Sequence, residues 1–302
     1  MQQSDYPILY QAADDASLSG QRWYMGLVQA DLVLIVVAAA LAAVGTLVPK
    51  QAGSVFAAIT VLVLFASLAA KSVNRQRQDD RDWFDGRAVA ESVKTETWRY
   101  MMRLAPFDDD TTCDREFAQR LLALSNARPH VHLSVRIAPA HTRQITGEMH
   151  RVRTLTFAQR RDLYVQERLD DQAMWYQRKS QFNGRRATQW FVASFGVQAG
   201  ALTLAVLHIA LPLPNIDLVG VLAALAAALT AWTQLKRHDE LAISYGLAYQ
   251  ELSTIGNLAG QATTEQELMG AVHSGESAIS REHMMWIAKR GEPLSNPYTT
   301  QP

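Results

Sequence analysis

Three small groups of residues in this chain could do chemistry, and the first is a pair of histidines. His130 and His132 stand two positions apart in a stretch that alternates apolar and polar residues up to Ile137. Such alternation predicts a half-buried strand, in which both imidazoles would project from one face and could bind a metal ion. No Cys or carboxylate lies at ligand spacing beside them. We therefore expect a short strand without a metal site.

An acidic run from Asp108 to Glu116 forms the second group, because it places side-chain oxygens at alternate positions as a calcium-binding loop does. It lacks the Gly at the sixth place and the Glu at the twelfth that such a loop requires. Thr111 followed by Asp114, just before an apolar helical run, is instead typical of a helix N-cap. The same pattern at Thr264 and Glu267 predicts the start of another helix.

Glu282 and His283, close to Trp286, form the third group and could pass a proton between them. Neighbouring positions on a helix point about 100° apart, and no nucleophile accompanies the pair, so a packed terminal helix is the better interpretation. The chain also lacks a Gly-rich phosphate loop, a nucleophile elbow and a metalloprotease helix. We therefore expect no enzyme activity, no cofactor and no bound metal.

The elements that must position these residues include four apolar stretches long enough to cross a bilayer, which needs roughly 20 residues each. They contain no Lys, Arg or Glu, and the acid Asp31 lies near the start of the first, where it can reach interfacial water. A buried soluble core would also be apolar, but each stretch here pairs with its neighbour through a very short turn. The sequence therefore predicts two transmembrane hairpins, with spans at residues 27–48, 54–70, 190–211 and 216–233.

The basic residues indicate how the hairpins are oriented. The two hairpin loops carry one Lys between them, whereas the other ends of the spans are flanked by Lys71, Arg75, Arg77, Arg178, Lys179, Arg185, Arg186, Lys236 and Arg237. Basic loops stay in the cytoplasm, so we expect a multi-pass protein of the inner membrane with both termini cytoplasmic. The start of the chain is acidic, and its first apolar run begins only at Leu27, which argues against a cleaved signal.

The composition of the chain limits the kinds of partner that it is expected to bind. The chain has 302 residues, with 29 basic and 29 acidic side chains that alternate in sign along the polar segments. Binding to nucleic acid is therefore disfavoured. The single Cys113 cannot form an intramolecular disulfide, in agreement with a reducing compartment.

The pattern of the polar segments predicts long helices that continue the spans. Residues 73–103 contain no Pro, and residues 241–255 carry an apolar face that ends at a stop signal, Gly256 and Asn257. Before the third span, aromatic and charged residues share a helical face: Phe157, Arg161, Tyr164, Arg168, Asp171 and Trp175. This face would suit a partner helix, although a solvated face with snorkelling arginines fits the pattern equally well.

The third span carries two further patterns. Gly196 and Gly200 form a Gly-x-x-x-Gly spacing, which predicts close packing against another helix. The most polar stripe of any span is a candidate pore lining, formed by Ser194, Gln198, Ala201, Ala205 and His208. With no charged ring, such a pore would gate by narrowing and dewetting. Alternatively, Gln198 and His208 only hydrogen-bond across packed helices.

Residues 145–290 contain a set of polar and aromatic residues on both sides of the second hairpin: Ile145, Thr146, Met149 to Arg153, Arg161, Tyr164, Arg168, Gln172, Trp175, Tyr176, Lys179, Ser180, Asn183, Tyr245 to Leu252, Glu276 to His283 and Trp286. In these residues the segment resembles the SLATT-domain family. The first hairpin looks like a second, partial copy. Its following helix reads Gly-x-Ala-x-x-Glu from Gly86, as the helix after the second hairpin does from Gly246. Hairpins repeated in parallel suit a pore better than an inverted-repeat transporter.

The resemblance implies a bacterial conflict-system effector that opens a pore or disrupts the membrane. A partner sensor or a nucleotide second messenger would activate it, and the family offers no catalytic site to transfer. We expect a homo-oligomer in the lipid bilayer. A membrane anchor or scaffold that presents a helical domain to a partner is the alternative.

The sequence therefore predicts an all-α membrane protein in which long cytoplasmic helices continue two hairpins. We expect a cytoplasmic N-terminal segment at residues 1–26 and the first hairpin with its following helix at residues 27–103. A cytoplasmic connector follows at 104–156, then the SLATT-like unit with the second hairpin at 157–290 and a flexible tail at 291–302. We expect helix contacts at a cytoplasmic seam of Arg161, Tyr164, Arg168, Gln172, Trp175, Glu282, His283 and Trp286.

Overall fold

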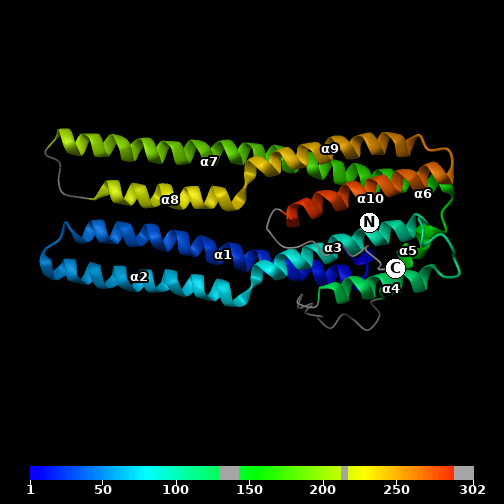
Figure 1. The fold of residues 1–302 in the computed structure, drawn as a ribbon, viewed down its shortest axis with the longest axis horizontal. Coiled ribbons are helices and arrows are strands. Elements are labelled where there is room, and N and C mark those ends of the chain that lie inside the picture. The colour runs from blue at the N-terminus through cyan, green and yellow to red at the C-terminus, as the bar shows by residue number, and fades with distance from the viewer. Residues whose placement is uncertain (129–142, 212–216, 289–302) are drawn as a thin grey trace. The chain divides into compact units, whose positions relative to one another are not determined.

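The computed structural model describes residues 1–128, 143–211 and 217–288, and within these ranges it contains helices and no strand (Figure 1). The prediction of an all-α protein is confirmed, whereas the strand predicted from His130 to Ile137 lies outside the described residues. The helices are η1 (Gln3–Asp5), α1 (Ile8–Gly45), α2 (Lys50–Arg77), α3 (Asp79–Met101), α4 (Cys113–Ala127), α5 (Gly147–Arg153), α6 (Phe157–Tyr164), the π-helical segment η2 (Val165–Asp170), α7 (Asp171–Ala210), α8 (Leu218–Lys236), α9 (His238–Gly260) and α10 (Glu265–Ala288).

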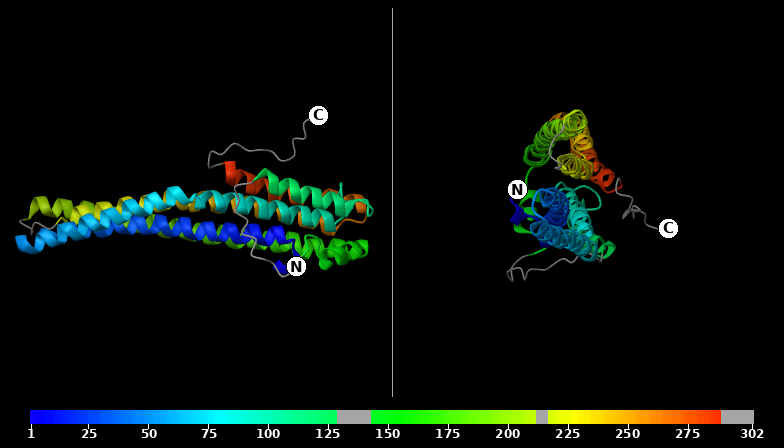
Figure 2. Two further views of the ribbon diagram at one scale, coloured as in Figure 1. Left: turned by 90° about the horizontal axis from the view of Figure 1, so that it is seen from below. Right: turned by 90° about the vertical axis from the view of Figure 1, so that its left-hand side faces the viewer.

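Four helical stretches are long and apolar enough to cross a membrane, which confirms the predicted spans. They form two hairpins, α1 with α2 and α7 with α8, and Figure 2 shows α1 and α2 (blue) side by side. In the first hairpin the Asp31 carboxylate accepts a hydrogen bond from Ser67 Oγ at 2.5 Å and lies 3.5 Å from Lys71 Nζ. Asp31 is therefore paired, as an ionisable group in a membrane usually is.

Neither the second span (α2) nor the fourth span (α8) continues unbroken into the helix that follows it. α2 ends at Arg77, Gln78 takes the left-handed conformation with φ 53°, and α3 begins at once. α8 ends in the same way, with Arg237 at φ 49° before α9. The expectation of one helix over residues 73–103 is therefore wrong. A left-handed L-residue costs roughly 1–2 kcal/mol, so each break is a defined feature of the backbone.

The acids that follow each break explain why a new helix starts there. Asp79, Asp80 and Asp82 occupy the first turn of α3, and Asp239 and Glu240 occupy the first turn of α9. Negative side chains at a helix N-terminus are stabilised by the helix dipole. The stop predicted at Gly256 is also wrong, since Gly256 is buried within α9 and the helix continues to Gly260.

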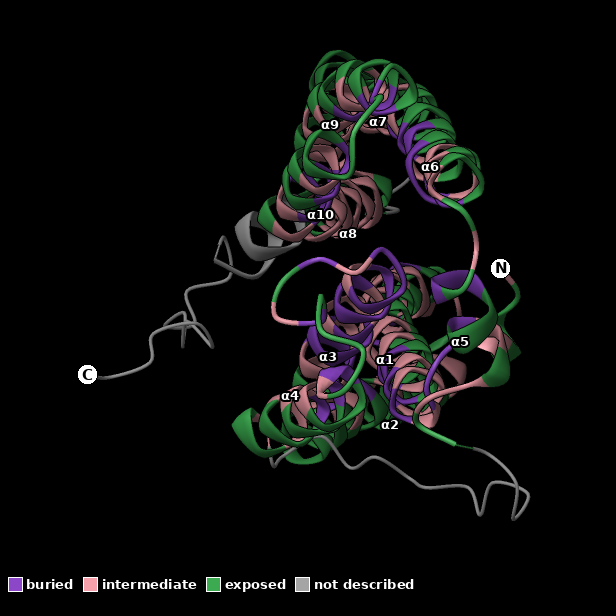
Figure 3. Ribbon diagram, turned by 90° about the vertical axis from the view of Figure 1, so that its right-hand side faces the viewer, coloured by how far each residue is buried: buried purple, intermediate pink, exposed green. Residues whose placement is uncertain are grey.

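The chain divides into two compact units. We call residues 1–21, 79–180 and those from Ile243 onward the helical body, and residues 22–78 and 181–242 the hairpin unit. Figure 3 marks buried residues in purple, and within the body they are prominent on α3 and α5. α3 is covered on several sides, because fourteen of its 23 residues are buried.

Both Gly-x-Ala-x-x-Glu repeats place their glycine against a serine of the helix that leads into the hairpin. A Cβ at Gly86 of α3 would lie 2.8 Å from the backbone oxygen of Ala13 and 2.9 Å from the nitrogen of Ser17. At Gly246 of α9 the nearest atom would be Ser180 Oγ, at 3.4 Å. The two halves of the body therefore use one packing scheme, which supports an internal duplication.

Candidate functional site

The most deeply buried ion pair of the helical body joins Arg168 of η2 to Glu276 of α10. Arg168 Nε lies 2.9 Å from Glu276 Oε1 and Nη2 lies 2.6 Å from Oε2, so the guanidinium binds both carboxylate oxygens. The two side chains are 1% and 2% exposed. Taking charges out of water costs several kcal/mol per ion, and the pair offsets this cost only while both partners are present.

Two hydroxyl groups complete the surroundings of the Glu276 carboxylate. Thr95 Oγ1 of α3 donates to Oε2 at 2.9 Å, and the Tyr164 hydroxyl of α6 donates to Oε1 at 3.3 Å. Burial and the Glu276 charge raise the pKa of Tyr164, so its hydroxyl stays a donor. Burial alone would lower the pKa of Arg168, but Glu276 outweighs it and raises this pKa. We call Thr95, Tyr164, Arg168 and Glu276 the buried network.

The backbone around Arg168 is adapted to this contact. Residues Val165–Asp170 form a π-helical segment, a rare geometry that is frequent at functional sites. On the facing helix, a Cβ at Gly275 would lie 2.7 Å from the Tyr164 hydroxyl and 2.9 Å from Leu169 Cδ2. Only a glycine allows α10 to approach so closely without displacing these buried side chains.

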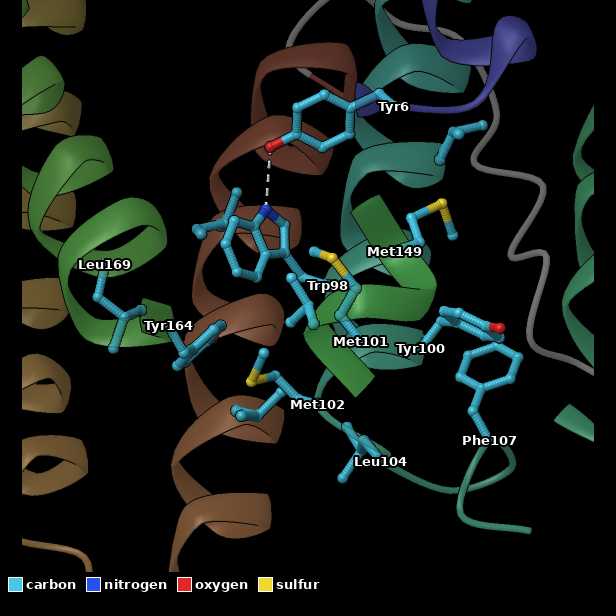
Figure 4. Packing of buried hydrophobic residues seen from close by; sticks show 14 of the residues in the cluster. Tyr6, Trp98, Tyr100, Met101, Met102, Leu104, Phe107, Met149, Tyr164 and Leu169 are labelled. Atoms are coloured by element: carbon cyan, nitrogen blue, oxygen red, sulfur yellow. Dashed lines mark hydrogen bonds between the residues drawn. The ribbon is translucent and has the colours of Figure 1, made fainter. Parts of the chain in front are cut away.

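The buried network continues into an aromatic core. The Trp98 indole donates to the Tyr6 hydroxyl at 3.1 Å, and its ring meets Tyr164 edge-on with centroids 5.7 Å apart (Figure 4). Burial raises the pKa of Tyr6 to about 12. The N-terminal segment, α3, α6 and α10 are thus held together by one connected set of aromatic and polar contacts.

Glu96, the neighbour of Thr95 on α3, is a second buried acid, and its carboxylate is less well paired than that of Glu276. Its Oε1 lies 3.2 Å from Arg99 Nη1 and 3.8 Å from Arg120 Nη1, while Oε2 has no hydrogen-bond partner in the described part of the chain. Burial raises the pKa of Glu96, although both arginines lower it. The negative charge of this carboxylate therefore opposes folding at neutral pH.

We expect Glu96→Gln to increase the free energy of unfolding at neutral pH, with a gain that shrinks as the pH falls. Because the pKa of Glu96 is raised in the folded state, protonation stabilises the fold. This stabilisation is fully present below the unfolded-state pKa of about 4.3 and is lost as the pH rises through the folded-state pKa. Denaturant unfolding of both proteins between about pH 4 and pH 7 measures the difference. A difference that does not change with pH would contradict this account.

Three arginines around this region bind helix ends. Arg153 Nη1 donates to the carbonyl oxygens of Tyr100 and Phe107, at 2.6 and 2.9 Å. Arg160 donates to the Met102 carbonyl and pairs with Glu265, and Arg161 donates to the Ala262 carbonyl at 3.1 Å. Cations at helix C-termini satisfy orphan carbonyls and complement the dipole, so these side chains fix the ends of α3 and α9.

The residues of the predicted seam have different environments. Tyr164 and Arg168 are buried in the network, and Arg161 caps a helix end as described above. Trp175 packs edge-on against Tyr245 of α9, with ring centroids 5.4 Å apart. Gln172 is partly buried. Glu282, His283 and Trp286 lie in α10, but their side chains are outside the described part of the structure.

In the third span the predicted residues differ in their surroundings and in their exposure. A Cβ at Gly196 would meet nothing within 4 Å, whereas one at Gly200 would reach Leu222 Cδ1 of α8 at 4.0 Å. Within the polar stripe, Ser194, Ala201 and Ala205 are partly covered, and Gln198 and His208 are exposed. Among the described residues, nothing packs against Gly196.

The acidic run from Asp108 does not form the predicted N-cap. α4 starts at Cys113 with Thr112 as its N-cap, and the Asp109 carboxylate instead accepts a hydrogen bond from the backbone nitrogen of Thr111 at 2.8 Å. The N-cap predicted at Thr264 is confirmed, because Thr264 Oγ1 accepts from the Glu267 nitrogen at 3.2 Å. No cluster of three metal-binding side chains occurs among the described residues, which exclude His130 and His132.

In the sequence, Glu276 belongs to the segment that carries the family resemblance, but it was not predicted as the central acid of the site. Glu276 stands in the apolar stripe of α10 that also contains Leu268, Val272 and Ile279, and all four are buried. An acid in an apolar stripe indicates a buried partner. Thr95 and the π-helical segment had no comparable signal in the sequence.

Comparison with protein-family models gave two matches that together cover most of the chain. Residues 7–161 match the SMODS and SLOG-associating 2TM effector domain 3, and residues 164–286 match the SMODS and SLOG-associating 2TM effector domain 1. The first match includes α1 to α5, and the second includes α7 to α9. Comparison with curated proteins and with solved structures gave no match. The buried network joins the matched regions, since Thr95 belongs to the first and Arg168 to the second.

Proposed function

The chain belongs to the SLATT family of SMODS and SLOG-associating 2TM effector domains, and we propose that it is a non-enzymatic effector that opens a pore or otherwise disrupts the membrane. The observation that carries this proposal is the pair of matches, one for each hairpin of a four-span protein. A chain that contains two effector domains supplies two membrane hairpins in a parallel arrangement, which suits a pore formed by several copies.

The activating signal would reach the helical body, which we infer to be cytoplasmic because basic residues flank the body-facing ends of the spans. The membrane would then be the inner membrane, with both termini cytoplasmic. The signal would come from a partner sensor protein or a nucleotide second messenger. The buried network supports a coupled response of the two domains, because the hydrogen bond from Thr95 to Glu276 links α3 of the first domain to α10 of the second.

The polar stripe of α7 supports a conduction path. Gln198 and His208 are exposed on the single chain and have no hydrogen-bond partner among the described residues. A polar side chain that faces lipid is costly, so in a membrane these groups should face water or another helix. Gly196 lies two residues from Gln198 and leaves open space beside the helix, which allows close approach of a second copy.

We expect Cys substitutions at 198 and 208 to make ion flux sensitive to water-soluble thiol reagents. Blocking should follow the whole stripe, with positions 194, 201 and 205 included, because modification would fill a water-filled path. The matched control is Cys at Val192 and Leu207, which are exposed on the opposite face of the same helix, in a background where Cys113 is replaced by Ser. Uniform protection at all positions would mean that the stripe only packs against other helices.

Reconstitution of the purified chain in liposomes tests the proposal as a whole. Release of an entrapped dye or an ion flux after addition of an activating partner or nucleotide is the expected result. A membrane that stays sealed while the body binds a cytosolic partner would support the alternative function, a membrane anchor or scaffold.

A further inference from the structure

The body-facing end of the second hairpin contains four basic side chains near a pair of tryptophans. The rings of Trp190 on α7 and Trp232 on α8 meet edge-on, with centroids 6.5 Å apart. One helical turn toward the body, α7 carries Arg186 and α8 carries Lys236. Farther from the hairpin loop, Asn183 of α7 contacts His238 at the start of α9, with Asn183 Oδ1 2.7 Å from His238 Nδ1. Arg186 and Lys236 are thus held at one level by contacts between the helices above and below them.

These cations have few acidic partners. Within the described residues, no carboxylate forms an ion pair with Arg185, Arg186 or Lys236, and only Arg237 has one, Glu240 at 2.7 Å. Lys236 Nζ instead lies 4.8 Å from the centre of the Trp232 ring, and the Arg186 guanidinium lies 5.5 Å from the Phe182 ring. Aromatic rings hold the two side chains in place without neutralising their charge.

The surface next to this cluster on α7 is apolar. Phe191, Val192 and Phe195 follow Trp190 within two turns, and all three are exposed. A ligand that satisfies both surfaces needs an anionic head for the cations and hydrocarbon chains for the apolar side. Tryptophans at this level are typical of the boundary between headgroups and hydrocarbon.

We propose that this end of the second hairpin is a binding site for the phosphate headgroup of an anionic phospholipid, formed by Arg185, Arg186, Lys236 and Arg237. The guanidinium of Arg186 is suited to bind two phosphate oxygens, while Lys236 contributes a point charge from the other helix. Basic residues next to a transmembrane helix attract anionic lipids in this way. The site is independent of whether a pore opens, and it would make the state of the hairpin depend on lipid composition.

Quenching of tryptophan fluorescence by brominated lipid tests the proposal. The full chain is reconstituted in phosphatidylcholine vesicles with increasing brominated phosphatidylglycerol, and the relative preference for the anionic lipid is measured. The variant Arg185→Gln, Arg186→Gln, Lys236→Gln is compared with a matched variant that removes three charges elsewhere, Lys50→Gln, Arg115→Gln, Arg143→Gln. All three control residues are exposed.

The preference should fall about fivefold for each charge removed from the site, and it should not change in the control. Arg185→Gln alone, at an exposed residue, should show the single-charge effect if the triple variant fails to fold. An unchanged preference in the site variants, or an equal loss in the control, would overturn the proposal. Full competition by millimolar inorganic phosphate would also overturn it in favour of a soluble anion.

Discussion

Replacing Glu276 by Ala is expected to lower the free energy of unfolding of the helical body by about 3–5 kcal/mol, because it leaves Arg168 buried and unpaired. The loss would be measured by denaturant unfolding of the full chain in detergent, followed by tryptophan fluorescence. If the buried network couples the two domains, the same variant should also leak in liposomes without an activator or fail to respond to one.

Two controls separate the buried charge from other effects. Arg281, which lies on the same helix as Glu276, pairs with Glu251 of α9. Its side chain is 58% exposed, so Arg281→Ala should change stability by only about 0–1 kcal/mol. The double variant Arg168→Met with Glu276→Leu removes both charges and should recover much of the loss. Equal losses in Glu276→Ala and Arg281→Ala would show that the buried pair has no special weight.

Gly86→Ala is also expected to destabilise the body, with a loss of about 1–3 kcal/mol. The added Cβ would meet the backbone of α1 at Ala13 and Ser17, and a backbone cannot move aside as a side-chain end can. The hydrogen bond from Ser17 Oγ to the Trp83 carbonyl, 3.0 Å long, fixes the two helices at this distance. Thermal or denaturant unfolding of the variant would measure the effect.

Gly270 of α10 is the matched control, since a Cβ there meets nothing within 4 Å. Gly270→Ala should stabilise the protein by about 0.5–1 kcal/mol, because Ala loses less backbone entropy in a helix than Gly. A gain at both positions would contradict the close helix contact at Gly86.

The four spans could be predicted from the sequence because each depends on the composition of one continuous segment. The N-cap at Thr264 could be predicted for the same reason, since its partner Glu267 is three residues away. The breaks at Gln78 and Arg237 could not, because neither residue is a glycine and nothing local marks a left-handed conformation there.

The buried network depends on contacts between distant segments, and this explains why only half of it was predicted. Arg168 and Tyr164 stood out on a helical face, but Thr95 reaches Glu276 across 181 positions of the chain. A single sequence carries no sign of such a pairing. Glu276 alone could have been found, as a charged residue within an apolar stripe.

The π-helical segment η2 has a mechanical consequence for the third span. A π-helix closes its hydrogen bonds over five residues and not four, so it winds less per residue than an α-helix. η2 leads directly into α7, a helix of 40 residues that continues to Ala210. Rewinding η2 as an α-helix would therefore turn all of α7 about its own axis and change the direction in which Gln198 points. Because Arg168 sits in η2, breaking the ion pair with Glu276 would remove a contact that opposes such rewinding.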